Sequence, residues 1–233
     1  MAYVGMVFNP EPDPQRVFVD QPRSPPSMRA RYVSGLYELE EMGPLPRQQA
    51  SQVGMDRAEV WVALTDGGSG LESFMETNFG RVDAVILDFY HAAEYLGKLA
   101  RAAHPQDEEA SKSLSAKWSR MLKEEGGELM VSVLECLEKP ASGSSWWRVY
   151  EEVMGYFRNQ CHRMDYPEYL SRGWYIGSGA VESGCKTVVN QRLKGAGQRW
   201  GEAGSHAVCH ARALYRSEKG QWEAFWDYAP ERR

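Results

Sequence analysis

The pattern of hydrophobic and polar positions predicts two strands and a helix at the start of the chain. Two segments, residues 2–8 and 31–37, carry β-prone side chains. The stretch between them is rich in proline, which can sit neither in a helix interior nor in an inner strand. We therefore predict two strands joined by a long exposed loop, and after them a helix over residues 47–57.

A strand, a helix and a second strand are predicted next. Residues 60–65 form a continuous apolar run that ends at the turn signal Asp66-Gly67-Gly68. Such a run is typical of a strand that is buried on both faces. Apolar side chains then recur at helical spacing over residues 71–79, and a second apolar run covers residues 82–89. This order predicts two parallel strands with a right-handed crossover.

Helical patterns dominate the rest of the chain. Strand signals stop between residues 90 and 169, which we interpret as an all-helical insertion. Its predicted helices cover residues 91–103, 110–123, 128–137 and 147–164. Two further helices are predicted at residues 180–193 and 206–217, and an aromatic segment follows at 222–226.

Composition excludes several classes of protein. The 233 residues are 42% hydrophobic and 25% charged, which is typical of a globular chain and not of a disordered or fibrous one. The longest clean apolar run, residues 84–87, is far shorter than the roughly 20 residues that cross a bilayer. The N-terminus lacks the basic and apolar parts of a secretion signal, so we expect a cytoplasmic protein with no membrane partner. The 4 cysteines form no CxxC pair, so neither a zinc knuckle nor a disulfide framework is predicted.

The charge is distributed unevenly along the chain. The net charge of −5 would weigh against nucleic acid as a partner if it were spread evenly. Residues 171–233, however, hold 10 Lys and Arg against 6 Asp and Glu, whereas residues 1–170 hold 17 against 26. The strongest imbalance lies in a basic stripe of Lys186, Arg192, Lys194, Arg199, Arg212 and Arg216, with Glu202 as its one acid. This stripe indicates either a phosphate-binding surface or a solvated helix face.

Two aspartates follow the predicted parallel strands. Asp66 and Asp88 stand at or near the carboxyl ends of these strands, where open parallel sheets bind their ligands. Asp66 is also a common turn former before glycine, and Asp88 is also a candidate cap of the next helix. His91, three residues after Asp88, is a candidate metal or phosphate contact, or a structural hydrogen-bonding residue.

A second group of candidates lies at the start of the helix at 180–193. Ser178, between two glycines, is a candidate N-cap, and Glu182 and Lys186 are one helical turn apart. Glu182 is either a metal ligand or half of a surface ion pair with Lys186. Asn190, Arg192 and Lys194 add donors that suit phosphate. Carboxylates grouped in this way would bind Mg²⁺, and two such ions about 3.5–4 Å apart support phosphodiester displacement.

The chain resembles the bacterial DDE insertion-sequence transposases of the ISKra group over nearly its whole length. The segments that carry the resemblance are residues 64–68, 86–92, 156–159 and 176–183, with Lys186 and residues 191–194. The resemblance implies a ribonuclease-H-like α/β fold with an all-helical insertion. It also implies Mg²⁺- or Mn²⁺-dependent cleavage and strand transfer at transposon ends, by a homo-oligomer on double-stranded DNA associated with the nucleoid.

The resemblance also assigns roles to residues. Asp66 takes the position of the second catalytic acid and Glu182 that of the third, and both would be metal ligands. Asp88 is a further candidate ligand, because related transposases place a Cys or Asp and a His near the active site in this segment. The accessory residues would be His91, Ser178 and Lys186, and the DNA contacts would be Asn190, Arg192, Lys194 and Arg199.

One departure from the family concerns the first catalytic aspartate, which lies on a central strand that this sequence lacks. Asp13 and Asp20 lie in the proline-rich loop and are poor substitutes. We therefore expect a truncated copy that is inactive alone, with an unpaired edge between the strands at 2–8 and 60–65. Its parts would be a partial core (1–92), the helical insertion (93–170), C-terminal core helices (171–217) and a tail (218–233).

Two other interpretations of the sequence remain open. One is a non-catalytic DNA-binding or regulatory protein that derives from a transposase and keeps the basic stripe. The other is an unrelated metal-dependent phosphatase or nuclease that uses Asp66, Asp88 and His91, and for which Glu182 would be dispensable.

Overall fold

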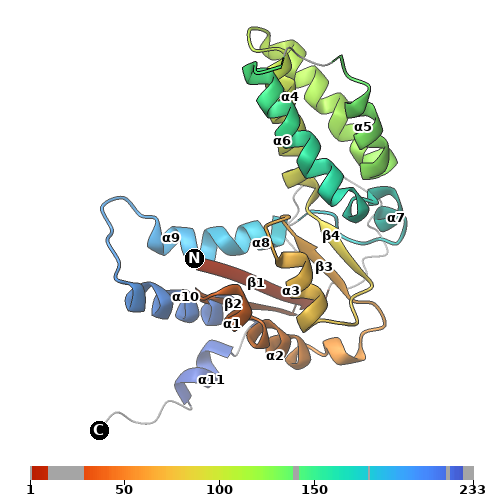
Figure 1. The fold of residues 1–233 in the computed structure, drawn as a ribbon. Coiled ribbons are helices and arrows are strands. Elements are labelled where there is room, and N and C mark those ends of the chain that lie inside the picture. The colour runs from red at the N-terminus through yellow and green to blue at the C-terminus, as the bar shows by residue number, and fades with distance from the viewer. Residues whose placement is uncertain (1, 10–28, 139–141, 178, 219–220, 228–233) are drawn as a thin grey trace. The chain divides into compact units, whose positions relative to one another are not determined.

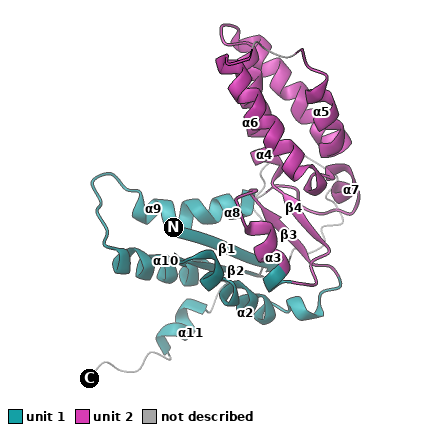
Figure 2. Cartoon of the chain, in the orientation of Figure 1, with its two compact units in different colours: residues 1–59, 77–79, 179–233 teal, residues 60–76, 80–178 magenta. Residues whose placement is uncertain are grey.

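A computed structural model describes residues 2–9, 29–138, 142–177, 179–218 and 221–227 of the chain (Figure 1). The fold is mixed α/β and mostly helical, with two small sheets. Two compact units are present (Figure 2). Unit 1 comprises residues 1–59, 77–79 and 179–233, and unit 2 comprises residues 60–76 and 80–178.

Unit 1 begins with the two predicted strands. β1 (Ala2–Asn9) and β2 (Arg29–Leu36) pair antiparallel, with Ala2 opposite Leu36 and Asn9 opposite Arg29. Both strand predictions are confirmed, whereas the predicted proline-rich loop, with Asp13 and Asp20, lies outside the described residues.

The predicted helix at 47–57 is shorter and begins earlier. After the short helix α1 (Leu39–Met42), α2 (Pro44–Gln52) starts at a proline, which suits the first turn of a helix because it lacks an N–H to satisfy. Gly54 then takes a left-handed φ of 85° and ends the helix. The last predicted turn is the separate 3₁₀ helix η1 (Met55–Arg57).

The rest of unit 1 consists of helices. The predicted helix at 180–193 consists of α8 (Gly179–Gly184), a π-helical segment η3 (Cys185–Asn190) and α9 (Gln191–Leu193). α10 (Glu202–Arg216) and α11 (Gln221–Asp227) follow it. The buried core of these helices is formed by Val188, Val189, Cys209 and Ala213, against which Val4, Tyr32 and Leu193 pack.

Unit 2 contains the predicted strand–helix–strand motif. β3 (Val62–Thr65) and β4 (Ala84–Leu87) pair in parallel, with Thr65 opposite Leu87, and α3 (Leu71–Asn78) lies between them in sequence. The prediction of parallel strands is confirmed. Among the described strands, β1 pairs with β2 and β3 pairs with β4, and the expected unpaired edge between residues 2–8 and 60–65 stays a prediction.

The helical part of unit 2 is built from long helices that pack side by side (Figure 1). The long helices are α4 (Phe89–Ala103), α5 (Glu108–Glu135) and α6 (Ser145–Gln160). The short 3₁₀ helix η2 (Cys161–Arg163) and the short helix α7 (Tyr166–Ser171) follow them. The predicted break at Gly126-Gly127 is a kink inside α5, where Gly126 has a φ of 83°. A Cβ on Gly127 would lie 2.7 Å from the Cβ of Met164, so the kink also lets α5 approach the chain after α6. No helix in the described ranges is long and apolar enough to span a membrane.

Candidate functional site

The carboxyl ends of β3 and β4 bring Asp66 and Asp88 to one edge of the parallel pair. Thr65 and Leu87 are opposite each other in the register, and each aspartate is the next residue along its strand. The backbone N–H of Asp88 donates to the carbonyl of Thr65 at 2.8 Å, so the ladder extends one residue beyond β4. Because paired strands lie about 4.8 Å apart, the two aspartates follow neighbouring strand ends, and a ligand site shared by both stays a prediction.

Asp66 is exposed and forms the turn that follows β3. Its Oδ1 accepts a hydrogen bond from the N–H of Gly68 at 3.0 Å, so the turn-forming interpretation is confirmed. Gly67 has a φ of 80°, and a Cβ on it would come within 2.7 Å of Leu87 Cδ1. The glycine thus lets the turn lie against the end of β4 while the carboxylate stays open to water.

Asp88 is buried and caps α4. Only 1% of the residue is exposed, and its Oδ1 accepts a hydrogen bond from the N–H of His91 at 2.8 Å. The capping interpretation is therefore confirmed. The cap fixes the carboxyl group of Asp88 at the first turn of α4, at the end of the strand next to the one that Asp66 follows.

An aromatic cluster surrounds His91. Its ring is edge-on to Tyr95 and Tyr156, with ring centroids 5.7 Å and 6.2 Å away, and the two tyrosines stack at 3.9 Å. The Nδ1 atom of His91 lies 3.9 Å from a carboxylate oxygen of Glu94. His91 is therefore part of the packing beside the site, and a metal or phosphate contact by it stays a prediction.

Tyr156 contributes a polar group that no described side chain or backbone group satisfies. Its hydroxyl is buried and has no hydrogen-bond partner within the described part of the chain. Burial raises the pKa of Tyr156 well above its usual value, and the nearby Tyr95, Asp66 and Asp88 raise it further. The group thus remains an O–H at neutral pH and is available as a donor beside the two aspartates.

Arg163 forms hydrogen bonds with both strands of the parallel pair, close to their carboxyl ends. It is 3% exposed, its Nε donates to the carbonyl of Val85 at 3.1 Å, and its Nη2 donates to the hydroxyl of Thr65. Its Nη1 donates to Gln160 Oε1 at 2.8 Å. The side chain therefore bonds to both strands just before they end, and its positive charge lies near the site.

Tyr166 fixes the end of β4 in a similar way, because its hydroxyl donates to the carbonyl of Leu87 at 3.1 Å. Sequence reasoning missed both Arg163 and Tyr166, which follow the strands by almost 80 residues or more. The one available signal was the positive charge of Arg163 in the short segment Cys161–Met164, whose other residues are Cys, His and Met.

Of the predicted site residues in unit 1, Glu182 lies on α8, Lys186 and Asn190 on η3 and Arg192 on α9. Lys194 and Arg199 follow α9, and Ser178 lies outside the described residues. Glu182 and Lys186 are both exposed, and no ion pair joins them among the described side chains. Lys186 lies in the π-helical segment, so the regular α-helical spacing that suggested their shared face ends before it.

The predicted DNA contacts of unit 1 form an exposed set. Asn190, Arg192, Lys194 and Arg199 are all open to solvent. This exposure is required of phosphate-binding side chains, and it is equally typical of a solvated face, so contact with DNA stays a prediction.

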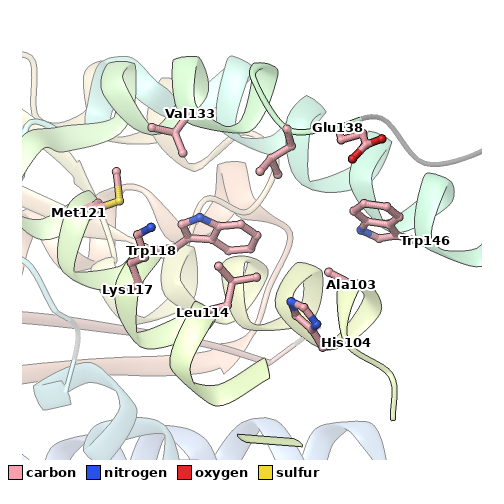
Figure 3. A pocket seen from close by; sticks show the side chains of 10 residues that line it. Ala103, His104, Leu114, Lys117, Trp118, Met121, Val133, Glu138 and Trp146 are labelled. Atoms are coloured by element: carbon pink, nitrogen blue, oxygen red, sulfur yellow. The ribbon is translucent and has the colours of Figure 1, made fainter. Parts of the chain in front are cut away.

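A pocket of about 400 Å³ lies in the helical part of unit 2, among α4, α5 and α6 (Figure 3). Its wall is mostly apolar, with Trp118, Met121 and Trp146, and His104 and Glu138 add polar groups. The indole N–H of Trp146 is buried without a hydrogen-bond partner in the described structure. None of the predicted site residues lines this pocket.

The chemistry of Asp66 and Asp88 fits Mg²⁺. This ion is commonly held by one or two carboxylates and completes its shell with water and substrate phosphates. No group of three His, Cys, Asp or Glu side chains that could hold a metal occurs in the described ranges. Glu182 belongs to unit 1 and the two aspartates belong to unit 2, so the predicted cage of three carboxylates stays a prediction.

Comparison with protein families, with curated proteins and with solved structures finds no match for this chain. The resemblance to DDE transposases therefore stays a prediction that depends on the motifs of the sequence.

Proposed function

We propose that this chain carries part of the catalytic machinery of a DDE transposase and is inactive alone, with a metal centre at the carboxyl ends of β3 and β4. The observation that supports the proposal best is the position of Asp66 and Asp88, each directly after a strand of one parallel pair. Carboxylates at such an edge are suited to Mg²⁺ or Mn²⁺, and the substrate would be double-stranded DNA at transposon ends, bound by a homo-oligomer.

The residues of this edge have distinct roles in the proposal. Asp66 is the exposed metal ligand, and Asp88 is the buried carboxylate beside it. When bound, Mg²⁺ would activate the attacking oxygen and neutralise charge on the phosphate. The unpartnered hydroxyl of Tyr156 would donate to a phosphate oxygen, and Arg163 would act as a positioning residue that holds both strand ends.

The proposal requires a further carboxylate. By resemblance this is Glu182, together with the family's first aspartate on a strand of its own. The described residues hold no three-ligand group, so we expect weak metal binding and no detectable strand transfer by the chain alone.

Manganese binding tests the metal centre. A Mn²⁺ titration of the full chain, followed by electron paramagnetic resonance, should show weak binding that Asp66→Asn reduces about tenfold or more. Asp227→Asn, the same change at an exposed position on α11, is the matched control and should leave binding unchanged. Equal Mn²⁺ affinity in the Asp66→Asn and unchanged chains would contradict a metal centre at this edge.

Strand transfer tests the expected inactivity. The assay uses Mn²⁺ and transposon-end DNA, and robust activity of the chain alone would show that its own carboxylates suffice.

The second candidate function is a non-catalytic DNA-binding or regulatory protein that derives from a transposase. The exposed basic side chains of unit 1 favour it, because such side chains would bind phosphate without any metal. Glu182→Ala separates the two functions if strand-transfer activity is reconstituted by adding a segment that carries the family's first aspartate. A transposase would lose catalysis and keep its DNA affinity, whereas a purely binding protein would show no catalysis to lose.

A further inference from the structure

Three arginines of unit 1 gather without any acid to neutralise them. Arg212, on α10, donates from Nη2 to the carbonyl of Thr187 at 2.6 Å, which holds its guanidinium against η3. Its Nε atom is buried and has no hydrogen-bond partner in the described structure. Arg192 and Arg216 are exposed and lie close enough to repel its charge. Among the described side chains, none of the three arginines forms an ion pair.

The local electrostatics agree with this geometry. Burial lowers the pKa of Arg212, and the neighbouring charges of Arg192 and Arg216 lower it further. Three cations that remain close together without a carboxylate are a site where an anion, phosphate above all, would relieve the repulsion.

A series of exposed aromatic rings continues from the arginines. The guanidinium carbon of Arg212 lies 5.6 Å from the ring centre of Tyr215, and Tyr215 lies 5.6 Å from Trp222 on α11. Trp226 follows at 5.4 Å from Trp222, and Phe225 lies 5.2 Å from Trp226. Tyr215, Phe225 and Trp226 are 55%, 52% and 56% exposed, which is unusual for such large apolar side chains.

We propose that Arg192, Arg212 and Arg216, together with the aromatic series from Tyr215 to Trp226, form a binding surface for single-stranded DNA. The arginines would contact phosphates, and the open ring faces would stack on unpaired bases. Bases in a duplex are already stacked on one another, so exposed rings favour a single strand over a duplex. The proposal goes beyond the proposed transposase function and does not depend on the metal centre of unit 2.

Fluorescence anisotropy with labelled oligothymidine tests the surface. The full chain should bind the single strand more tightly than a duplex of the same length. Trp226→Ala and Tyr215→Ala should each weaken single-strand binding about fivefold to a hundredfold, the range measured for the loss of one stacked base. They should leave the dependence of affinity on salt concentration unchanged, because neither removes a charge.

Charge variants test the phosphate contacts. Arg216→Gln should weaken binding and lower the slope of log affinity against log salt by about 0.7 for a single strand. Arg120→Gln, an exposed arginine on α5 in unit 2, is the matched control and should change neither affinity nor slope. Arg216 and Trp226 are both exposed, so their variants should fold even if Arg212→Gln, which removes the bond to Thr187, does not.

Three results would overturn the proposal. The first is tighter binding of the duplex than of the single strand. The second is single-strand affinity that is unchanged in both Trp226→Ala and Arg216→Gln. The third, seen by analytical ultracentrifugation, is a dimer that Trp226→Ala converts to a monomer without loss of single-strand affinity, because the rings would then form an interface between two copies of the chain.

Discussion

The Nε2 atoms of His206 and His210, one turn apart on α10, lie 3.0 Å from each other. The backbone N–H of Leu36 donates to His206 Nδ1 at 3.1 Å, so a neutral His206 carries its proton on Nε2 and donates it to His210. The hydroxyl of Tyr37 lies 2.5 Å from His210 Nε2. This network joins the end of β2 to α10, and it requires a neutral His210 ring, because the Nε2 atom of His210 accepts the bond from His206.

Acid should therefore weaken unit 1. Protonated His210 would carry an N–H on Nε2, so this atom could no longer accept the bond from His206. Burial, and then the neighbouring His206, lower the pKa of His210 below 6.5. The folded chain thus binds protons less readily than the unfolded chain, and this part of the stability is lost as the pH falls below 6.5. The loss of about one hydrogen bond predicts a melting midpoint lower by about 2–4 °C.

Thermal unfolding at pH 8 and pH 5.5, followed by circular dichroism, measures this loss. His206→Gln should show a smaller decrease than the unchanged chain. His104→Gln, at an exposed position in unit 2, should keep the full decrease. A decrease of the same size in all three proteins would mean that other groups cause it.

Gly67→Ala should destabilise unit 2 more than Gly54→Ala destabilises unit 1. Both glycines have a positive φ, 80° and 85°, so both substitutions cost about 1 kcal/mol of backbone strain. A Cβ at position 54 meets nothing within 4 Å, whereas one at position 67 comes within 2.7 Å of Leu87 Cδ1. Urea unfolding should therefore show about 1–3 kcal/mol of additional loss for Gly67→Ala. Equal losses would contradict the close approach of the turn to β4.

Local patterns made much of unit 2 predictable, but they do not record contacts between distant residues. Two apolar runs and the signal Asp66-Gly67-Gly68 are local, and they were sufficient to predict β3, β4 and the edge where the aspartates lie. The sequence also offered the capping role of Asp88 as one of two interpretations. This was possible because the cap joins Asp88 to His91, only three residues away. Arg163 contacts Thr65 across 98 positions of sequence, and no periodicity reports such a contact.

The π-helical segment η3 shows the same limit in unit 1. Its buried residues, Val188 and Val189, pack on Cys209 and Ala213 of α10. The segment that makes these contacts departs from α-helical geometry, and hydrophobic spacing alone did not predict this departure. The basic stripe was visible in the sequence. The gathering of Arg192 with Arg212 and Arg216 required the fold.

Arg163→Met should cost far more stability than Arg158→Met. Arg163 is buried and donates to Val85, Gln160 and Thr65, so its removal leaves buried acceptors unsatisfied. We expect a loss of about 2–4 kcal/mol in urea unfolding. Arg158 forms an ion pair with Glu135 at 2.7 Å in which both side chains are about half exposed, so its loss should cost less than about 1 kcal/mol. Similar losses for the two variants would show that Arg163 does not hold the strand ends.

Tyr156→Phe and Tyr166→Phe remove the same atom, a buried hydroxyl oxygen, from two tyrosines, and the expected results are opposite. The hydroxyl of Tyr166 donates to the carbonyl of Leu87 at 3.1 Å, so its loss should cost about 1–2 kcal/mol. The hydroxyl of Tyr156 has no partner among the described residues, so its loss should leave stability unchanged or raise it by up to about 1 kcal/mol. In the proposed metal centre, this hydroxyl would donate to an anion bound beside Asp66 and Asp88. Tyr156→Phe should therefore lower the affinity of the full chain for inorganic phosphate in the presence of Mn²⁺, while Tyr166→Phe should not. Loss of stability in Tyr156→Phe with unchanged phosphate affinity would instead make this hydroxyl a structural group.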